Sequence, residues 1–241
     1  MSAMLGKGAL ALWIDVAPPL ERETDDWYVD EHLPERIDIG GYLRARRYGA
    51  LQGSPGYLTL FEASTPEALA SEGYLSLVGQ ISEQSQRIRA GFSNVVRNTF
   101  QVRATAGRGV GAVMASYRLR PGAGGRAETL PAAALGTLDT LAPQLLRHRD
   151  VVGAHWLQGV PQVRARMDAV RAVGKDDAAA DHVLLIETTR EATAQHMRDA
   201  VLSDTALAAL GWQVESLAVY GLLYEVSDRL SGTETTLGDR Q

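Results

Sequence analysis

The sequence predicts an α+β protein in which two similar halves close into one barrel within a single chain. Three observations support this prediction. Segments with the two-residue apolar alternation of strands are separated by segments with helical periodicity. The order strand, helix, strand, strand, helix, strand occurs twice, on either side of a glycine-rich joint at 106–109. Four antiparallel strands with helices on one face leave the other face bare, so two such sheets are expected to cover each other.

The first half is expected to span residues 1–104. Aliphatic residues alternate along the first strand, and the periodicity then becomes helical. A Gly-Gly pair at 40–41 ends this helix, and a Thr-Pro pair at 65–66 is typical of the start of the next one. The predicted strands are 8–17, 42–51, 57–64 and 94–105, and the predicted helices are 18–38 and 65–89.

The second half, residues 111–228, repeats this order. A polar insertion at 164–181 is expected to form a mobile loop or lid, and residues 229–241 a flexible tail. The predicted strands are 112–121, 153–158, 182–189 and 216–226, and the predicted helices are 127–150 and 191–210. The fold class is therefore α+β, with two tandem ferredoxin-like β-α-β-β-α-β halves forming an intrachain α/β barrel.

Composition excludes several classes of function. Hydrophobic residues make up 45% of the 241 residues and charged residues 22%, which is typical of a folded globular protein. The net charge of -5, without a basic run, argues against nucleic acid as a partner. The absence of cysteine excludes disulfides, iron-sulfur clusters and thiol nucleophiles. No apolar stretch approaches the roughly 20 residues that span a bilayer, so no membrane contact is expected and the protein is predicted to be cytoplasmic.

One local pattern resembles a known family. It consists of Trp27-Tyr28-x-x-Glu31-His32-Leu33-Pro34, then GYLRARRY at 41–48 and YLTLFE at 57–62. This pattern is similar to the dimeric α/β-barrel superfamily, and within it to the EthD-like branch, over roughly residues 8–104. The resemblance implies a barrel whose members include ring isomerases, polyketide cyclases, cofactor-free oxygenases and haem-dependent enzymes.

The resemblance also implies a catalytic role for His32. In several such relatives the histidine of the first helix points into the barrel and acts on a small aromatic or lactone-like substrate. Tyr28 precedes His32 by one helical turn and is the second catalytic candidate. Aligning Gly153 with Gly41 places Gln144 opposite His32, so we expect one functional pocket. The alternative is a structural His32 that bonds to Glu31 or to a strand carbonyl.

Strand alternation supplies the candidate substrate-binding residues. In the strand at 42–51, Tyr42, Arg44, Arg46 and Tyr48 share one face. If that face lines the lumen, the two arginines need partners, for which Asp15 and Glu62 are the candidates, or they bind a substrate carboxylate or enolate. The predicted substrate-binding set is Trp13, Asp15, Arg44, Arg46, Tyr48, Tyr57, Phe61 and Trp156. The alternative for the aromatic members is ordinary core packing, and His155 and Trp156 cannot both face inward.

Together these residues predict an enzyme that transfers a proton on a small carbonyl-containing metabolite, aromatic or not. The expected reaction is that of an isomerase, cyclase or lyase, with a cofactor-free oxygenase next. The alternative is a non-catalytic ligand-binding or stress-responsive barrel, which a lumen lacking a cavity of about 300 Å³ would favour. No metal or cofactor is expected because the five histidines are scattered, although haem on His32 or His155 is an alternative. A homodimer is a further expectation.

Overall fold

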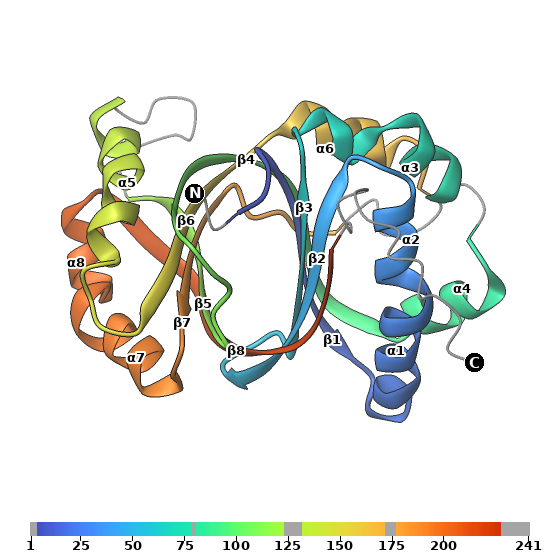
Figure 1. Ribbon diagram of the computed structural model, residues 1–241, viewed down its shortest axis with the longest axis horizontal. Coiled ribbons are helices and arrows are strands. Elements are labelled where there is room, and N and C mark those ends of the chain that lie inside the picture. Colours follow the sequence, from blue (N-terminus) through green and yellow to red (C-terminus); the bar gives the residue numbers. More distant parts are fainter. Residues whose placement is uncertain (1–3, 79–80, 123–131, 172–176, 228–241) are drawn as a thin grey trace, which may run out of the picture.

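The computed structural model describes residues 4–78, 81–122, 132–171 and 177–227. Each half contributes four strands to one barrel (Figure 1). The strands of the first half are β1 (Gly8–Val16), β2 (Tyr42–Gln52), β3 (Tyr57–Ala63) and β4 (Phe92–Gly107). The strands of the second half are β5 (Val113–Pro121), β6 (Val151–Gly159), β7 (His182–Thr188) and β8 (Trp212–Ser227).

Helices cover the outside of the barrel in two groups, and residues 161–168 of the second half lie with the first-half group (Figure 1). In the first half a 3-10 turn (Pro18–Leu20), α1 (Glu21–Trp27), a π-helical turn (Tyr28–His32) and α2 (Leu33–Asp38) follow each other without a break, and a 3-10 turn (Glu67–Ala70), α3 (Glu72–Val78) and α4 (Glu83–Ala90) follow β3. The second half carries α5 (Ala132–Leu145), α6 (Pro161–Asp168), α7 (Glu191–His196), a π-helical turn (Met197–Val201) and α8 (Asp204–Ala209).

The barrel is closed, with the strand order β1-β3-β2-β8-β5-β7-β6-β4. In each half the first and third strands lie in the middle and the second and fourth strands lie at the edges. The halves join where β2 pairs with β8 and where β4 pairs with β6. All strand pairs are antiparallel. Closure leaves no sheet edge open to pairing with another chain. The predicted fold class is confirmed.

The two halves share their strand register as well as their order. A bulge separates Tyr42 from Arg44 in β2, and a bulge separates Val151 from Gly153 at the matching place in β6. Arg44 pairs with Glu62, as Gly153 pairs with Glu187. Gly153 thus matches Arg44 and not Gly41. The sequence alignment that placed Gln144 opposite His32 is therefore wrong by three residues.

Large side chains occupy the centre of the lumen. One core cluster contains the inward residues of both sheets, including the large side chains of Trp13, Tyr48, Phe100, Met114 and Tyr220. Two further clusters lie between the barrel and the helices, one in each half. The barrel wall therefore has a buried inner face and a buried outer face, and both are predominantly apolar.

The helical predictions differ from the structure in detail. Residues 164–168 of the predicted mobile insertion belong to α6 (Pro161–Asp168), whose Val163 and Met167 are buried against the first-half helices. The helix predicted at 65–89 is divided into three short helices, and that predicted at 127–150 is described only from 132, where it forms α5. The predicted tail at 229–241 lies outside the described residues.

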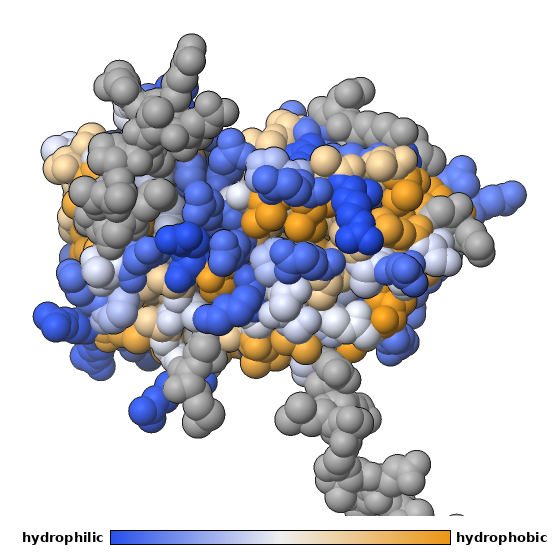
Figure 2. Space-filling model, turned by 90° about the horizontal axis from the view of Figure 1, so that it is seen from above, coloured by the Kyte–Doolittle hydropathy of each residue, from blue (hydrophilic) through white to orange (hydrophobic). Residues whose placement is uncertain are grey.

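The outer surface carries polar residues over much of the face seen from above, where they divide the apolar surface into separate areas (Figure 2). In the described part of the chain, no helix has the length and apolar character needed to cross a membrane. The homodimer remains a prediction.

Candidate functional site

The lumen contains a closed network of charges. Arg46 donates to Glu62 Oε1 at 2.8 Å and to Glu187 Oε1 at 2.9 Å, and all three side chains are fully buried. Arg44 Nε donates to Glu62 Oε1 at 2.8 Å. His155 bonds to Glu187 through Nε2 at 2.9 Å. The two arginines and two glutamates balance each other in charge, whereas Arg46 Nε and the hydroxyl of the neighbouring Tyr48 are buried without a hydrogen-bond partner among the described residues.

The charge network tests the prediction that Glu62 and Asp15 are the partners of Arg44 and Arg46. Glu62 is a partner of Arg44 and Arg46, as predicted. Asp15 instead lies at the end of the barrel, where it accepts hydrogen bonds from the Gly56 backbone at 2.6 Å and from Asn94 at 2.6 Å. Burial raises the pKa of Glu187, but the Arg46 charge and the His155 hydrogen bond outweigh burial and bring that pKa to about 2.

Three of the predicted lumen residues lie outside the lumen. Tyr57 and Phe61 alternate with the inward residues Leu58 and Leu60, so their side chains point toward the helices. Trp156 belongs to the outer core of the second half, where it contacts His182 and Trp212, while its neighbour His155 points inward. Trp13, Arg44, Arg46 and Tyr48 do line the lumen. The bulge after Tyr42 turns that residue to the outer face, away from Arg44 and Arg46.

His32 also lies outside the lumen, between the first helical segment and the outer face of the first-half sheet. The expectation that it points into the barrel is wrong. The π-helical turn Tyr28–His32 explains its place, because Leu33 N donates to the carbonyl of Tyr28, five residues back. Pro34 has no N–H to donate to the carbonyl of Asp30, which interrupts the α-helical bonding here. The wider turn buries both Tyr28 and His32.

Aromatic rings hold His32 in position. Its imidazole stacks on the Trp27 indole with ring centres 4.2 Å apart and an angle of 19°. Tyr28 and Phe61 meet it edge-on at 5.2 and 6.0 Å. The indole Nε1 of Trp27 in turn donates to Ser85 Oγ at 3.1 Å. His32 is therefore fixed by packing, and Phe61, predicted to bind substrate, serves as one of its walls.

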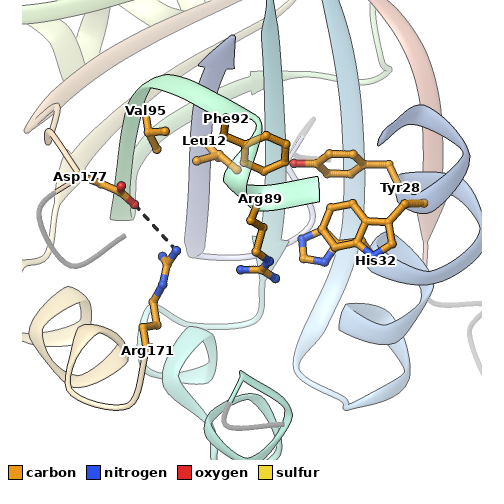
Figure 3. A pocket seen from close by; sticks show the side chains of 9 residues that line it. Leu12, Tyr28, His32, Arg89, Phe92, Val95, Arg171 and Asp177 are labelled. Carbon is orange, nitrogen blue, oxygen red and sulfur yellow. Dashed lines mark ion pairs between the residues drawn. The ribbon is translucent and has the colours of Figure 1, made fainter. Parts of the chain in front are cut away.

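A cavity of about 240 Å³ opens beside His32. Its walls come from the first helical segment, the end of α4, the outer faces of β1 and β4, and the segments on either side of 172–176. Figure 3 shows the guanidinium groups of Arg89 and Arg171 and the ring of His32 directed toward the same space. The lining residues are Leu12, Trp27, Tyr28, His32, Arg89, Phe92, Val95, Arg171 and Asp177.

The cavity keeps His32 neutral. Burial lowers its pKa well below the usual value, and Arg36 and then Arg89 lower it further. Within the described part of the chain, His32 Nδ1 and the Tyr28 hydroxyl are buried without a hydrogen-bond partner. Two buried polar groups without partners beside a cavity indicate a place where a ligand supplies the bonds.

Arg47 and Tyr57 stabilise the wall behind Tyr28. The guanidinium of Arg47 lies 3.9 Å from the ring centre of Tyr28 and 4.3 Å from that of Tyr57. Arg47 Nε also donates to Asp25 Oδ1 at 2.9 Å. Tyr57 therefore supports the site through Arg47, because its ring does not line the cavity.

Sequence reasoning did not identify Arg89, Arg171 or Asp177. Arg89 occupies a position in a short amphipathic helix, where an arginine is usually solvated. Arg171 and Asp177 lie within the polar insertion at 164–181, for which the sequence predicts a mobile loop or lid. The only available signal was the proximity of Arg89 to Gly91 and Phe92, which begin a strand, and it does not indicate a cavity.

Neither candidate haem ligand has room for a porphyrin. His32 borders a cavity of about 240 Å³, which is far smaller than a haem needs. His155 lies inside the filled lumen, with its ring nitrogens bonded to Thr105 and Glu187. Among the residues that the structure describes, no group of three or more His, Asp or Glu side chains could hold a metal ion. Activity without a cofactor remains a prediction.

No family model matches the sequence, and no curated protein matches it. Solved structures with a similar fold include an anthrone oxidase-like protein, with a TM-score of 0.58 and 12% identity over 95% of this chain and 96% of that one. A protein from Fusobacterium nucleatum that is assigned as a monooxygenase has a TM-score of 0.54 and 9% identity, over 93% and 96% of the two chains. A haem-binding protein from Thermus thermophilus has a TM-score of 0.52 and 13% identity, over 91% and 92%.

These identities establish the fold alone. The chain forms a closed eight-stranded barrel and shares its overall fold with these solved structures. Its placement in the EthD-like branch stays a prediction.

Proposed function

We propose that the protein is an enzyme that removes a proton from the carbon next to the carbonyl group of a small aromatic ketone, with His32 as the base. One observation carries this proposal. His32 is a buried imidazole with a lowered pKa, at the wall of a cavity, with one ring nitrogen that no described residue bonds. A base must be unprotonated before it can act, and burial and the nearby cations keep this imidazole neutral at pH 7.

Each wall residue has a role in this step. The rings of Trp27 and Phe92 and the side chain of Leu12 provide an apolar surface for a planar substrate. His32 takes the proton from carbon, and the Tyr28 hydroxyl donates a hydrogen bond to the enolate oxygen that forms. The enolate then lies beside the new imidazolium, whose charge it balances. A low pKa weakens His32 as a base, and the negative charge of the bound enolate offsets that weakness.

An enolate is a common intermediate of the three kinds of reaction that the sequence predicts. Return of the proton to another carbon gives isomerisation, attack on a second carbonyl gives cyclisation, and reaction with O₂ gives oxygenation. An anthrone is a ketone with an acidic CH₂ group, and one protein with this fold is named anthrone oxidase-like. We therefore choose anthrone as the first probe. Its oxidation balances as anthrone plus O₂ giving anthraquinone plus water.

The test separates proton removal from oxidation. Without O₂ in D₂O, wild-type protein should exchange the CH₂ protons of anthrone for deuterium faster than buffer does. His32→Gln should lower the enzymatic rate by roughly 100-fold or more, the usual contribution of a positioned base, with the melting temperature within a few degrees. His182→Gln, which changes a buried histidine of the second half, is the matched control and should keep the rate. Admission of O₂ then shows whether anthraquinone forms.

Equal exchange rates in wild-type and His32→Gln protein would contradict the proposal. So would the absence of enzymatic exchange with anthrone and with the smaller ketone 2-indanone.

A non-catalytic binding protein is the second candidate. The filled lumen and the cavity of about 240 Å³, below the usual lower bound of about 300 Å³, favour it. Binding of anthrone without exchange would select this candidate.

A further inference from the structure

The charged groups at the cavity are not balanced. Three charged residues line it, which are Arg89, Arg171 and Asp177. Asp177 lies 3.8 Å from Arg171 and also accepts a bond from Arg97 at 3.4 Å. Asp177, the one carboxylate among the described lining residues, is thus shared between two arginines. With His32 neutral, these described lining residues carry one positive charge in excess.

Arg89 is the residue left without a counter-ion. Within the described ranges, no carboxylate lies within 4.0 Å of its guanidinium, whereas the exposed Arg87 of the same helix pairs with Glu23. The Nε atom of Arg89 is buried without a hydrogen-bond partner. The guanidinium carbon of Arg89 lies 5.6 Å from the ring centre of Trp27. A largely buried cation without a partner is costly, and proteins rarely keep one without a use.

Two acidic side chains near Arg89 have other partners. Glu31 and Glu35 line a separate cavity of about 70 Å³ that Arg89 also borders. Glu31 Oε1 accepts hydrogen bonds from Ser85 at 3.0 Å and from Ser82 at 3.3 Å. Glu35 lies 3.8 Å from Arg36. Burial raises the pKa of Glu35, while the charges of Arg36 and then Arg89 act to lower it. Burial and then Arg36 lower the pKa of Arg89, as expected where positive charges lack an anion.

We propose that the cavity binds an aromatic monocarboxylate, with the carboxylate of the ligand between Arg89 and Arg171 and its ring against Trp27 and Phe92. Figure 3 shows the two guanidinium groups on the side of the cavity away from Tyr28. The carboxylate supplies the negative charge that the lining lacks and accepts hydrogen bonds from Arg89. The volume of about 240 Å³ matches roughly eight water molecules, at about 30 Å³ each, which limits the ligand to about three fused rings at most.

This inference rests on the proposed function for the identity of the site and names the class of substrate that the site takes. His32 and Tyr28 act on the carbonyl end of the substrate, and Arg89 with Arg171 hold the acid end. The acid group then places the reacting carbon at His32, as remote binding groups do in other enzymes.

The test compares two probes of nearly equal shape, 2-naphthoate and its neutral amide, 2-naphthamide. Titration calorimetry with the full chain at pH 7 should show that naphthoate binds about 10- to 100-fold more tightly, as expected for a charge-assisted hydrogen bond in a buried site. Arg89→Gln should remove this preference. Arg87→Gln, the same substitution two residues away on the exposed face of α4, should retain it.

Three outcomes would overturn the inference. The wild-type protein could bind the two probes equally, it could bind neither, or Arg89→Gln could retain the preference for naphthoate. Should Arg89→Gln fail to fold, Arg89→Lys keeps the charge but loses the planar donor pair, and at least part of the preference must then remain.

The binding test and the exchange test fail independently. Naphthoate preference without deuterium exchange of any ketone would leave the carboxylate site and remove the proposed function. Exchange of the uncharged anthrone without naphthoate preference would leave the function and remove the carboxylate site.

Discussion

The two halves of the barrel have the same frame and different contents. Both have matching strand register and matching bulges. Both also contain a buried histidine stacked on a tryptophan, His32 on Trp27 at 4.2 Å and His182 on Trp156 at 5.4 Å. In the first half this stack borders a cavity, whereas in the second half it is packed against Trp212.

Residues at matching positions explain the difference. When the two halves are compared in their shared register, Leu12 of β1 occupies the position equivalent to Tyr117 of β5. Phe92 of β4 is likewise equivalent to Trp212 of β8. Tyr117 and Trp212 are both fully buried. Arg89 stands two residues before the glycine that ends α4, and Ala209 stands at the same place in α8. The second half thus has larger side chains at the positions of Leu12 and Phe92, and an uncharged alanine at the position of Arg89.

The comparison shows how a site arises in a duplicated frame. A leucine and a phenylalanine leave space that a tyrosine and a tryptophan would occupy, and one arginine gives that space its charge. The frame itself needs none of these changes, because the lumen network and the strand pairing belong to both halves.

The largest difference between the halves is expected on removal of the matched aromatic ring. Trp212→Ala should lower the free energy of unfolding by about 3–5 kcal/mol, because it leaves a void in a dry core. Phe92→Ala removes a ring that is already partly exposed at the cavity and should cost about 1 kcal/mol or less. Urea unfolding at pH 7 measures both. Equal losses would show that the first half is packed as tightly as the second.

Exchange of a wall residue for its second-half counterpart should close the site. Leu12→Tyr places the ring of Tyr117 in the first-half cavity and should weaken naphthoate binding at least tenfold, equivalent to about 1.4 kcal/mol. Stability should fall by no more than about 1 kcal/mol, since the ring enters existing space. Calorimetry of Leu12→Tyr against Leu12→Val, which keeps the space, measures the effect. Unchanged binding in Leu12→Tyr would place the ligand elsewhere.

Removal of the Arg89 charge should stabilise the ligand-free protein. Arg89→Met keeps an unbranched side chain and removes a cation without a counter-ion among the described residues, so unfolding should become harder by about 1–2 kcal/mol. Arg87→Met, on the exposed face, should change stability by no more than about 0.5 kcal/mol. A clear loss of stability in Arg89→Met would indicate that Arg89 has a partner in the folded protein.

The smallest effect is expected in the pH dependence of stability. His32 is neutral in the folded state but has an ordinary pKa near 6.5 when unfolded, so the unfolded state binds more protons below that pH. Wild-type stability should fall by up to about 1.4 kcal/mol per pH unit as the pH drops below about 6.5. Burial lowers the pKa of His182 as well, which adds a contribution of the same sign.

His32→Gln should therefore flatten the curve of melting temperature against pH between about 7 and 5, and His182→Gln should flatten it less. Identical slopes in wild-type and His32→Gln protein would show that His32 is not buried in its neutral form. Glu187, with its pKa at about 2, stabilises the fold above about pH 4.5 and loses that contribution only below it.

The sequence predicts the architecture because order and periodicity report the elements directly. Alternation along β1 and β3 also shows which residues share a face. It does not show which face is inward, because a barrel covered by helices buries both faces of its wall. The prediction that Tyr57 and Phe61 face the lumen is wrong for this reason. Their neighbours Leu58 and Leu60 are the residues that face inward.

The site is predictable only at the residues that carry the motif. His32 and Tyr28 stand in a distinctive pattern, and both line the cavity. Their orientation depends on a π-helical turn, which adds one residue to the turn and leaves no mark in the apolar periodicity. Arg89 and Arg171 reach the cavity from elements distant in sequence, and only tertiary contacts bring them together.

A crystal structure of the protein soaked with 2-naphthoate tests the central claim most directly. We predict density for the naphthalene ring between the first helical segment and the outer faces of β1 and β4, beside His32, with the carboxylate between Arg89 and Arg171. Ligand density within the lumen beside Arg46, or against Trp212 in the second half, would contradict the account. So would a fully soaked crystal in which the space beside His32 holds only water.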